Sequence, residues 1–203
     1  MKLSKKGEYA LRSLINLGIA AEMKRKLVQV SELAENEQLP VKFLEQILQA
    51  LKEAGIVASE RGKFGGYRLA KPARKIFIGE VVRLIDGPLA PIGCVSQTAY
   101  EPCTCPDEAH CGLRMLMVDV RNAIADILDR YTLADVVEIT MRKMRRDSVS
   151  LPFSARGANE PPPSRVPARM ARQQLSRKGR HARGSRSSPS EGVLHHILGE
   201  YSI

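Results

Sequence analysis

The segment LPVKFLEQILQALKEAGIVASERGKFGGYRL, residues 39–69, decides the fold class of this chain. Pro40 suits the first turn of a helix, and Gly55 stops the apolar repeat that follows it. The repeat advances in three- and four-residue steps and places apolar side chains on one helix face, at Phe43, Leu44, Ile47, Leu48 and Leu51. The pattern predicts an amphipathic helix that buries this face and leaves the opposite face polar.

A basic hairpin is expected directly after this helix. Ile56 and Val57 start a strand, residues 61–66 form a glycine-rich turn, and residues 67–69 return as a second strand. A solvated surface hairpin is the plain alternative. The position after a third helix favours a DNA-binding wing instead.

Two helical patterns precede this segment. Residues 8–24 carry apolar side chains at helical spacing, and residues 28–39 suit a short helix with Ser31 as its N-cap. Three helices with a short turn between the second and third form a helix-turn-helix. The sequence therefore predicts a mainly α fold, a winged helix-turn-helix with a two-stranded β wing.

Three more helices are expected downstream, over residues 76–85, 113–131 and 133–144. A segment with prolines and no sustained period separates the first two. The long helix carries an apolar face wide enough to pack against another helix. Its members are Leu113, Leu116, Val120, Ile124, Ile127 and Tyr131.

The charge favours a polyanionic partner. The 203 residues carry a formal net charge of +10, which indicates DNA, RNA or an anionic membrane surface. No stretch approaches the ~20 apolar residues that cross a bilayer, and the first residues do not resemble a signal peptide, so we expect a cytoplasmic protein. Residues 148–203 hold nine Lys or Arg against three Asp or Glu, and predict a disordered basic tail after two domains, residues 1–75 and 76–147.

All four cysteines lie in residues 94–111. They are Cys94, Cys103, Cys105 and Cys111. In a cytosolic protein, clustered cysteines bind metal more often than they form structural disulfides. Zinc, a disulfide switch and ordinary buried thiols are the alternatives. We see no nucleophile–base constellation and no phosphate loop, and therefore do not expect an enzyme.

Several segments in fixed order resemble the Rrf2 family of bacterial transcription regulators, including its IscR-like and NsrR-like branches. The resemblance covers residues 1–145 and says nothing about the tail. It implies a homodimer in which the long helix packs antiparallel against its counterpart. The matching segments are KLSKKGEYALRSL (2–14), LPVKFLEQILQALKEAGIV (39–57), RGKFGGYRLAKP (61–72), CPDEAHCGLR (105–114) and YTLADV (131–136).

The family often holds a [2Fe–2S] or [4Fe–4S] cluster through three thiolates and one weaker ligand, since thiolates are soft, anionic donors. The five residues between Cys105 and Cys111 match the family spacing. Eight residues separate Cys94 from Cys103, where many relatives have five. The resemblance therefore implies Cys94, Cys105 and Cys111 as ligands, with Cys103 as a substitute for Cys105 or as its redox partner.

The fourth ligand is open in this sequence. Arg114 stands where IscR-like proteins have a histidine. NsrR-like proteins instead use a carboxylate near the N-terminus, which reaches across from the other subunit. Glu8 stands at that place and is the first choice, and His110 is the second. A first-turn glutamate that stabilises its helix is the plain alternative for Glu8.

A winged dimer predicts an imperfect palindromic operator in double-stranded DNA. The polar face of the helix over residues 41–54 enters the major groove and offers Lys42, Glu45, Gln46 and Gln49. Resemblance to IscR-like proteins implies a role in base discrimination for Glu45, which would otherwise be an exposed helical glutamate. Phosphate or minor-groove contacts are expected from the first helix and the wing, at Ser4, Lys5, Tyr9, Arg61, Lys63, Gly65, Gly66 and Arg68.

These features predict a sequence-specific transcription regulator, a repressor, whose operator affinity is controlled by an iron–sulfur cluster that senses redox state, iron or nitric oxide. Two alternatives stay open. One is a cluster-free regulator switched by cysteine oxidation or a small ligand. The other is an accessory protein that binds nucleic acid without specificity through its basic tail.

Overall fold

The structure is a computed structural model and describes residues 2–153. All of them fall in one compact unit. The predicted basic tail lies outside the described residues from residue 154 onward, and the predicted domain boundaries stay a prediction.

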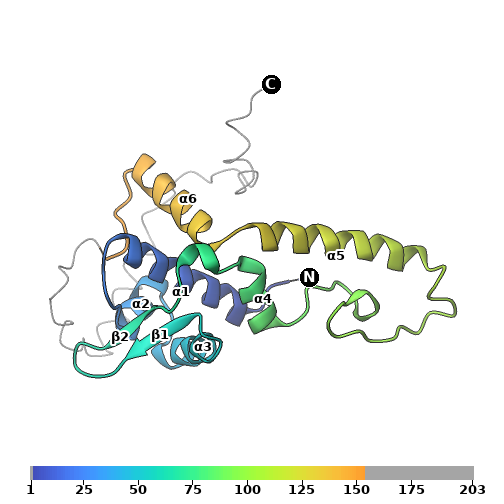
Figure 1. The fold of residues 1–203 in the computed structure, drawn as a ribbon, viewed down its shortest axis with the longest axis horizontal. Coiled ribbons are helices and arrows are strands. Elements are labelled where there is room, and N and C mark those ends of the chain that lie inside the picture. The colour runs from blue at the N-terminus through green and yellow to red at the C-terminus, as the bar shows by residue number, and fades with distance from the viewer. Residues whose placement is uncertain (1, 154–203) are drawn as a thin grey trace, which may run out of the picture. The chain divides into compact units, whose positions relative to one another are not determined.

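The N-terminal half confirms the winged helix-turn-helix (Figure 1). Its elements are α1 (Lys5–Glu22), α2 (Val30–Glu37), α3 (Val41–Glu53), β1 (Val57–Glu60) and β2 (Gly66–Leu69). The two strands pair antiparallel, with Val57 opposite Leu69 and Glu60 opposite Gly66. The turn between them spans residues 61–65, as the glycine pattern predicts.

The predicted N-cap of α2 is wrong. The cap is Gln29, and Ser31 lies inside the helix. The reason is tertiary, because Val28 and Tyr67 exchange backbone hydrogen bonds of 2.9 and 2.8 Å. This bridge holds the chain extended up to Gln29, so the helix begins at Val30. The bridge also joins the wing to the α1–α2 connection.

The C-terminal half contains α4 (Ile78–Asp86), α5 (Gly112–Arg130) and α6 (Leu133–Arg146), with short 3₁₀ turns at Ala73–Lys75 and Gly93–Val95. The helix predicted from residue 76 begins two residues later. Phe77 pairs with Thr132 in an isolated bridge, so this part of the chain is extended. Thr132 then starts α6 with a capping box, in which its hydroxyl accepts from the Asp135 N–H.

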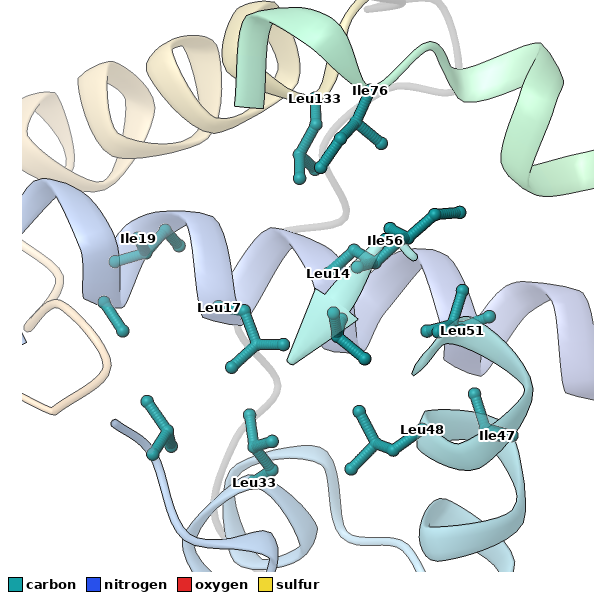
Figure 2. Close-up of a cluster of buried hydrophobic side chains, with 14 of the residues drawn as sticks. Leu14, Leu17, Ile19, Leu33, Ile47, Leu48, Leu51, Ile56, Ile76 and Leu133 are labelled. Atoms are coloured by element: carbon teal, nitrogen blue, oxygen red, sulfur yellow. The ribbon is translucent and has the colours of Figure 1, made fainter. Parts of the chain in front are cut away.

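One hydrophobic core joins both halves (Figure 2). Leu14 and Leu17 of α1 lie at its centre, and α3 contributes the apolar face that the sequence predicts. Leu44, Ile47, Leu48 and Leu51 are fully buried, as are Ile76 and Leu133. Phe43 lies at the rim of the core, where it is half-buried and its ring packs edge-on against Tyr9.

The helix α5 differs from the other long helices. It runs away from the winged part, and the segment with the cysteines lies beside it (Figure 1). None of its 19 residues is buried. No helix within residues 2–153 is long and apolar enough to span a membrane.

Candidate functional site

The polar face of α3 is exposed as predicted. Lys42, Glu45, Gln46 and Gln49 all point away from the core, because their positions alternate with the four buried aliphatic residues. Gln49 donates to the Glu53 carboxylate at 2.8 Å. The other three side chains form a polar row on one exposed helix face.

The wing lies next to this row. Partial burial raises the pKa of Tyr67 in β2, and the charge of the Glu45 carboxylate adds to the effect. Glu45 on α3 and the wing therefore face a common region. Arg61 and Lys63 are exposed at the wing tip, whereas Arg68 pairs with Glu60 across the hairpin at 3.4 Å.

The two wing glycines are required by close backbone contacts. A Cβ at Gly65 would overlap the Glu60 carbonyl oxygen, and a Cβ at Gly66 would overlap the Val28 carbonyl oxygen. Both positions therefore exclude side chains. Close packing of the wing requires these glycines, whatever their part in DNA contact.

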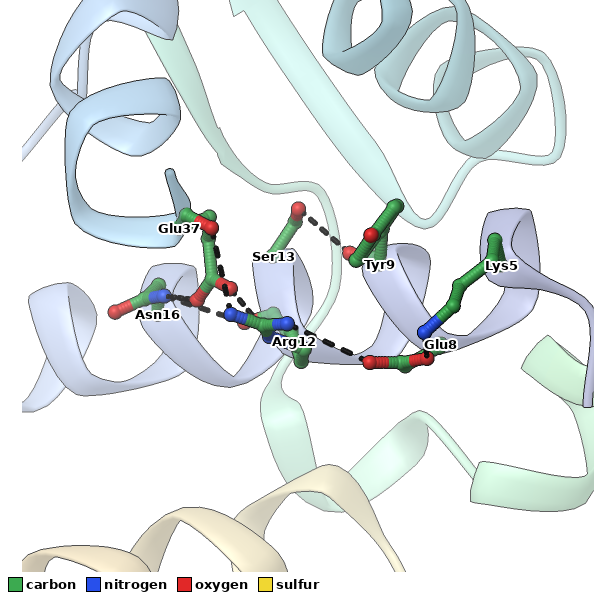
Figure 3. Close-up of polar contacts among 7 residues, drawn as sticks. All are labelled: Lys5, Glu8, Tyr9, Arg12, Ser13, Asn16 and Glu37. Carbon is green, nitrogen blue, oxygen red and sulfur yellow. Dashed lines mark hydrogen bonds and ion pairs between the residues drawn. The ribbon is translucent and has the colours of Figure 1, made fainter. Parts of the chain in front are cut away.

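The start of α1 carries a chain of polar contacts (Figure 3). Glu8 pairs with Lys5 at 2.7 Å and with Arg12 at 3.5 Å. The bond from Lys5 lowers the pKa of the Glu8 carboxyl. Within its own chain Glu8 thus serves as an ion-pair partner for two cations, close to Tyr9.

Arg12 extends these contacts to the helix-turn-helix (Figure 3). It pairs at 2.5 Å with Glu37, a buried carboxylate at the end of α2, which also accepts from the Asn16 amide. Tyr9 contacts Phe43 of α3 with ring centroids 5.9 Å apart. The N-terminal half of α1 is therefore connected to both helices of the helix-turn-helix. Sequence reasoning missed Arg12 and Glu37, although the Glu8–Arg12 spacing of four was visible.

The cysteines form one connected group in the loop before α5. Cys94 is buried, Cys103 and Cys111 are half-buried, Cys105 is exposed, and all four are free thiols. Hydrogen bonding with Cys103 and Cys111 raises the pKa of Cys105 to about 11. Burial raises the pKa of Cys94, and the nearby Cys103 adds to this. Cys103 is therefore adjacent to both Cys94 and Cys105.

Two arginines of α5 tie this loop to the helix. Arg114 donates to the Cys94 carbonyl at 3.3 Å and pairs with Glu108 at 3.0 Å. Arg121 donates to the Val95 carbonyl at 2.6 Å. Glu108 also accepts from the Tyr100 hydroxyl at 2.7 Å. Arg114 thus fixes the loop from the position at which IscR-like proteins have a histidine.

The donor set suits a soft metal centre, because four thiols lie within one loop. The thiols are neighbours pair by pair, but within residues 2–153 no three His, Cys, Asp or Glu side chains are grouped closely enough to hold a metal ion. Of the two predicted fourth ligands, His110 is exposed and lies 2.7 Å from Asp107, and Glu8 is on α1. The thiols fit a cluster by their chemistry, and the segment between Ser96 and Cys111 would have to close around it.

The helix α4 connects the loop region to the winged part. Arg83 forms two 2.6 Å bonds with Asp129 of α5, and these bonds lower the pKa of the Asp129 carboxyl. Asp86, the last residue of α4, accepts from the Ser4 backbone N–H at 2.8 Å and from the Ser4 hydroxyl at 2.5 Å. Since Ser4 is the N-cap of α1, α4 contacts α5 at one point and the first turn of α1 at another.

The predicted dimerisation face of α5 is mostly uncovered in the single chain. Leu113, Leu116, Val120 and Ile127 are all exposed, the first two by more than half of their surface. Ile124 is half-buried. Tyr131 differs, because it packs against a small internal cluster of Ile78, Val82 and Leu89.

Comparison with known proteins identifies a family for two thirds of the chain. Residues 3–139 match the Rrf2 family, which is described as an iron-dependent transcriptional regulator. A putative HTH-type regulator from Rhodobacter capsulatus, described as rrf2-like, is 42% identical over 139 residues, which are 66% of this chain and 91% of that protein.

Two solved structures share the fold. CymR of B. subtilis, described as the global cysteine regulator, superposes with a TM-score of 0.57 at 30% sequence identity. The match covers 68% of this chain and 98% of the CymR chain. IscR of T. potens superposes with a TM-score of 0.54 at 28% sequence identity. The match covers 69% of this chain and 88% of the IscR chain. These relatives are transcriptional regulators, which agrees with the expectation that the chain is not an enzyme.

Proposed function

The chain belongs to the Rrf2 family of transcriptional regulators, and from this premise we propose that it binds a palindromic operator as a homodimer and represses transcription in the cytoplasm, with an affinity set by an iron–sulfur cluster in its cysteine loop. The observation that carries the proposal is the contact path of α4. This helix touches both the first turn of α1 and the helix that anchors the cysteine loop.

Base reading is proposed for the exposed row of α3, Lys42, Glu45, Gln46 and Gln49. Amide and ammonium groups can donate to purine acceptors, and the Glu45 carboxylate can accept from a cytosine amino group. Phosphate contacts are proposed for Lys5, Tyr9, Arg61, Lys63 and Arg68, with close approach at Gly65 and Gly66. The N–H and hydroxyl of Ser4 both donate to Asp86, so Ser4 can donate to a phosphate only after these two hydrogen bonds break. Its phosphate contact would therefore be linked to a movement of α4.

The homodimer is supported by the exposed aliphatic face of α5. This helix leaves most of that face exposed within its own chain, so the face is available to another partner. Leu113, Leu116, Val120, Ile124 and Ile127 recur in three- and four-residue steps along one helix face, so a second copy in antiparallel orientation can cover them. Two recognition helices related by a twofold axis then read two half-sites.

For the cluster we propose Cys94, Cys105 and Cys111 as ligands, with Cys103 as the substitute for Cys105 or as its redox partner. Glu8 of the partner subunit is the first choice for the fourth ligand, and His110 is the second. When bound, the cluster supplies a redox- and nitric-oxide-sensitive centre. The chain's own residues do the rest. Arg114 and Arg121 hold the Cys94 and Val95 carbonyls against α5, so rearrangement of the thiols acts on this helix and, through Arg83 and Asp129, on α4.

The first test is anaerobic purification of the full-length protein with visible absorption and with iron and sulfide assays. The proposal predicts broad absorption between roughly 320 and 460 nm with equal iron and sulfide. Cys111→Ser should reduce the cluster content strongly, because no other thiol is proposed to replace this ligand, and Thr104→Ser in the same loop serves as the matched control. A colourless protein that binds no iron after anaerobic reconstitution would contradict the proposed cluster. The proposal that the protein binds DNA would not be affected.

A cluster-free thiol switch is the second candidate. It is favoured by the adjacency of Cys103 to both Cys94 and Cys105, because neighbouring thiols can form a disulfide under oxidation. In this case the metal-free protein would change its operator affinity on treatment with peroxide, and Cys103→Ser would remove the response. Cys103→Ser should not change nucleic-acid binding if the protein instead responds to a small ligand. The same holds if it is an accessory protein that binds through its tail.

A further inference from the structure

Phe64 at the tip of the wing is the most exposed large apolar side chain among residues 2–153, with 69% of its surface accessible. Phe64 is not part of the hydrophobic core of the winged part. A phenylalanine in this position adds nothing to the hairpin register, which is set by β1 and β2. The packing of the winged part therefore does not account for a phenylalanine at this position.

The turn that carries Phe64 is held in place. Gly65 donates to the Gly62 carbonyl at 3.0 Å, and the Gln29 side chain donates to the Lys63 carbonyl at 3.3 Å. The Val28–Tyr67 bridge fixes the base of the wing to the α1–α2 connection. Close contacts with backbone oxygens exclude side chains at Gly65 and Gly66. The ring is thus presented from an ordered support and not from a loose loop.

The surroundings of the ring are cationic. The Lys63 ammonium lies 5.7 Å from the ring centroid, and Arg61 is exposed in the same turn. Phe64 is the one large apolar side chain in the turn sequence Arg-Gly-Lys-Phe-Gly-Gly. A single ring between cations and glycines lacks the apolar area of a protein interface. It matches a narrow groove whose edges are lined with phosphates.

From these observations we infer that Phe64 is a wedge that enters the minor groove of operator DNA and partly unstacks one base step in each half-site. Apolar side chains that act in this way kink the duplex toward the major groove. Pyrimidine–purine steps are unstacked at least cost, so the wedge adds a preference for such a step at a position that no polar side chain reads. This inference rests on the proposed function, because it requires a dimer that binds DNA through α3 and the wing.

The test uses the full-length protein and a duplex that this protein selects from a random-sequence pool. 2-Aminopurine is placed in turn at each adenine of the flank where the wing lies, and its fluorescence is read at saturating protein. The wild type should raise the fluorescence at one step in each half-site. Phe64→Ala should abolish the rise and weaken binding to the selected duplex by about tenfold, the usual effect of losing an aromatic contact with a base.

Two further variants separate the wedge from the charge. Phe64→Leu keeps an apolar wedge and should retain part of the rise. Lys63→Ala should weaken binding to selected and scrambled duplexes alike and should retain the full rise at saturation. Equal fluorescence for the wild type and Phe64→Ala overturns the inference, as does loss of the rise in Lys63→Ala. If instead the wild type does not distinguish the selected duplex from a scrambled one, the proposed function itself fails.

Discussion

The helices α3 and α5 are both amphipathic, but the apolar face of α3 is buried and that of α5 is mostly exposed. The 13 residues of α3 include four aliphatic side chains that are fully buried within the chain. The 19 residues of α5 include none, and Leu113 and Leu116 are each more than half exposed. The winged part thus buries its apolar face within one chain, whereas α5 leaves most of its apolar face exposed.

The two regions also differ in the kind of contact that holds them. The winged part is held by aliphatic packing around Leu14 and Leu48, which has few alternative arrangements. The cysteine loop is held to α5 by hydrogen bonds from Arg114 and Arg121 to two backbone carbonyls. Polar contacts at partly exposed positions are worth less and can be exchanged. A rigid DNA-binding part and a cysteine loop that can rearrange are the combination that the proposed regulation requires.

The largest expected effect comes from charging the exposed face of α5. Leu116→Asp places a carboxylate where the proposed homodimer has a second copy of the helix, and an unpaired buried charge is costly. We expect a monomer in sedimentation velocity and an operator affinity reduced by at least ~100-fold, because the two half-sites are no longer linked.

The matched control for this variant is Asp126→Asn, which alters an exposed polar position of the same helix. It should leave a dimer. A Leu116→Asp protein that remains dimeric would show that the exposed face of α5 is not the interface, and would break the contrast between the two regions.

The next effect is on stability. Leu48→Ala removes a fully buried side chain of α3, and we expect the free energy of unfolding to fall by about 3 kcal/mol. Urea titrations at one fixed protein concentration give the comparison. An equal loss in Ala50→Gly at the half-buried edge of the same helix would mean that helix propensity, and not packing, dominates in α3.

A smaller effect is expected at the junction of α5 and α6. Thr132→Ala removes the capping box of α6, whose hydroxyl accepts from the Asp135 N–H at 3.3 Å, and should cost about 1 kcal/mol. Thr132→Ser keeps the hydroxyl and should be close to the wild type in the same titration. Equal stability of Thr132→Ala and the wild type would contradict the role of the cap.

The sequence predicts the winged part well because its signals are local. The polar row of α3 follows from the helical period alone, and the wing turn follows from its glycines. The failures have tertiary causes. Ser31 is not an N-cap, because the Val28–Tyr67 bridge comes from a strand that lies 39 positions away along the chain. The contact of Ser4 with Asp86 joins residues 82 positions apart, and no local pattern predicts it.

The cysteine loop lies between these cases. The cluster of thiols and their spacing are visible in the sequence, but the anchoring by Arg121 and the position of Glu108 between Tyr100 and Arg114 are not. Arg114 stands out in the sequence only as a departure from the histidine of IscR-like proteins. Its contact with the Cys94 carbonyl depends on how the loop folds back along α5.

The smallest expected effect on stability belongs to the link between the regions. Arg83→Lys keeps the charge but loses the two-bond geometry with Asp129. Both side chains are more than a third exposed, so the stability should change by less than about 1 kcal/mol. The ratio of the operator affinities measured with and without the cluster should nevertheless move toward one.

Arg142→Lys is the matched control, because Arg142 forms a similar exposed pair with Glu138 on α6, away from the loop. It should change neither stability nor the affinity ratio. A wild-type ratio in Arg83→Lys would show that the state of the loop reaches the DNA-binding surface without this contact.

The central claim is that the state of the cysteine loop sets operator affinity, and one measurement tests it most directly. The operator dissociation constant of a single anaerobic preparation is determined by fluorescence anisotropy at fixed salt, first with the cluster reconstituted and then after its removal by a chelator under reducing conditions. We predict at least a ~10-fold difference between the two states, about 1.4 kcal/mol of coupling. Equal affinities in the two states would contradict the claim.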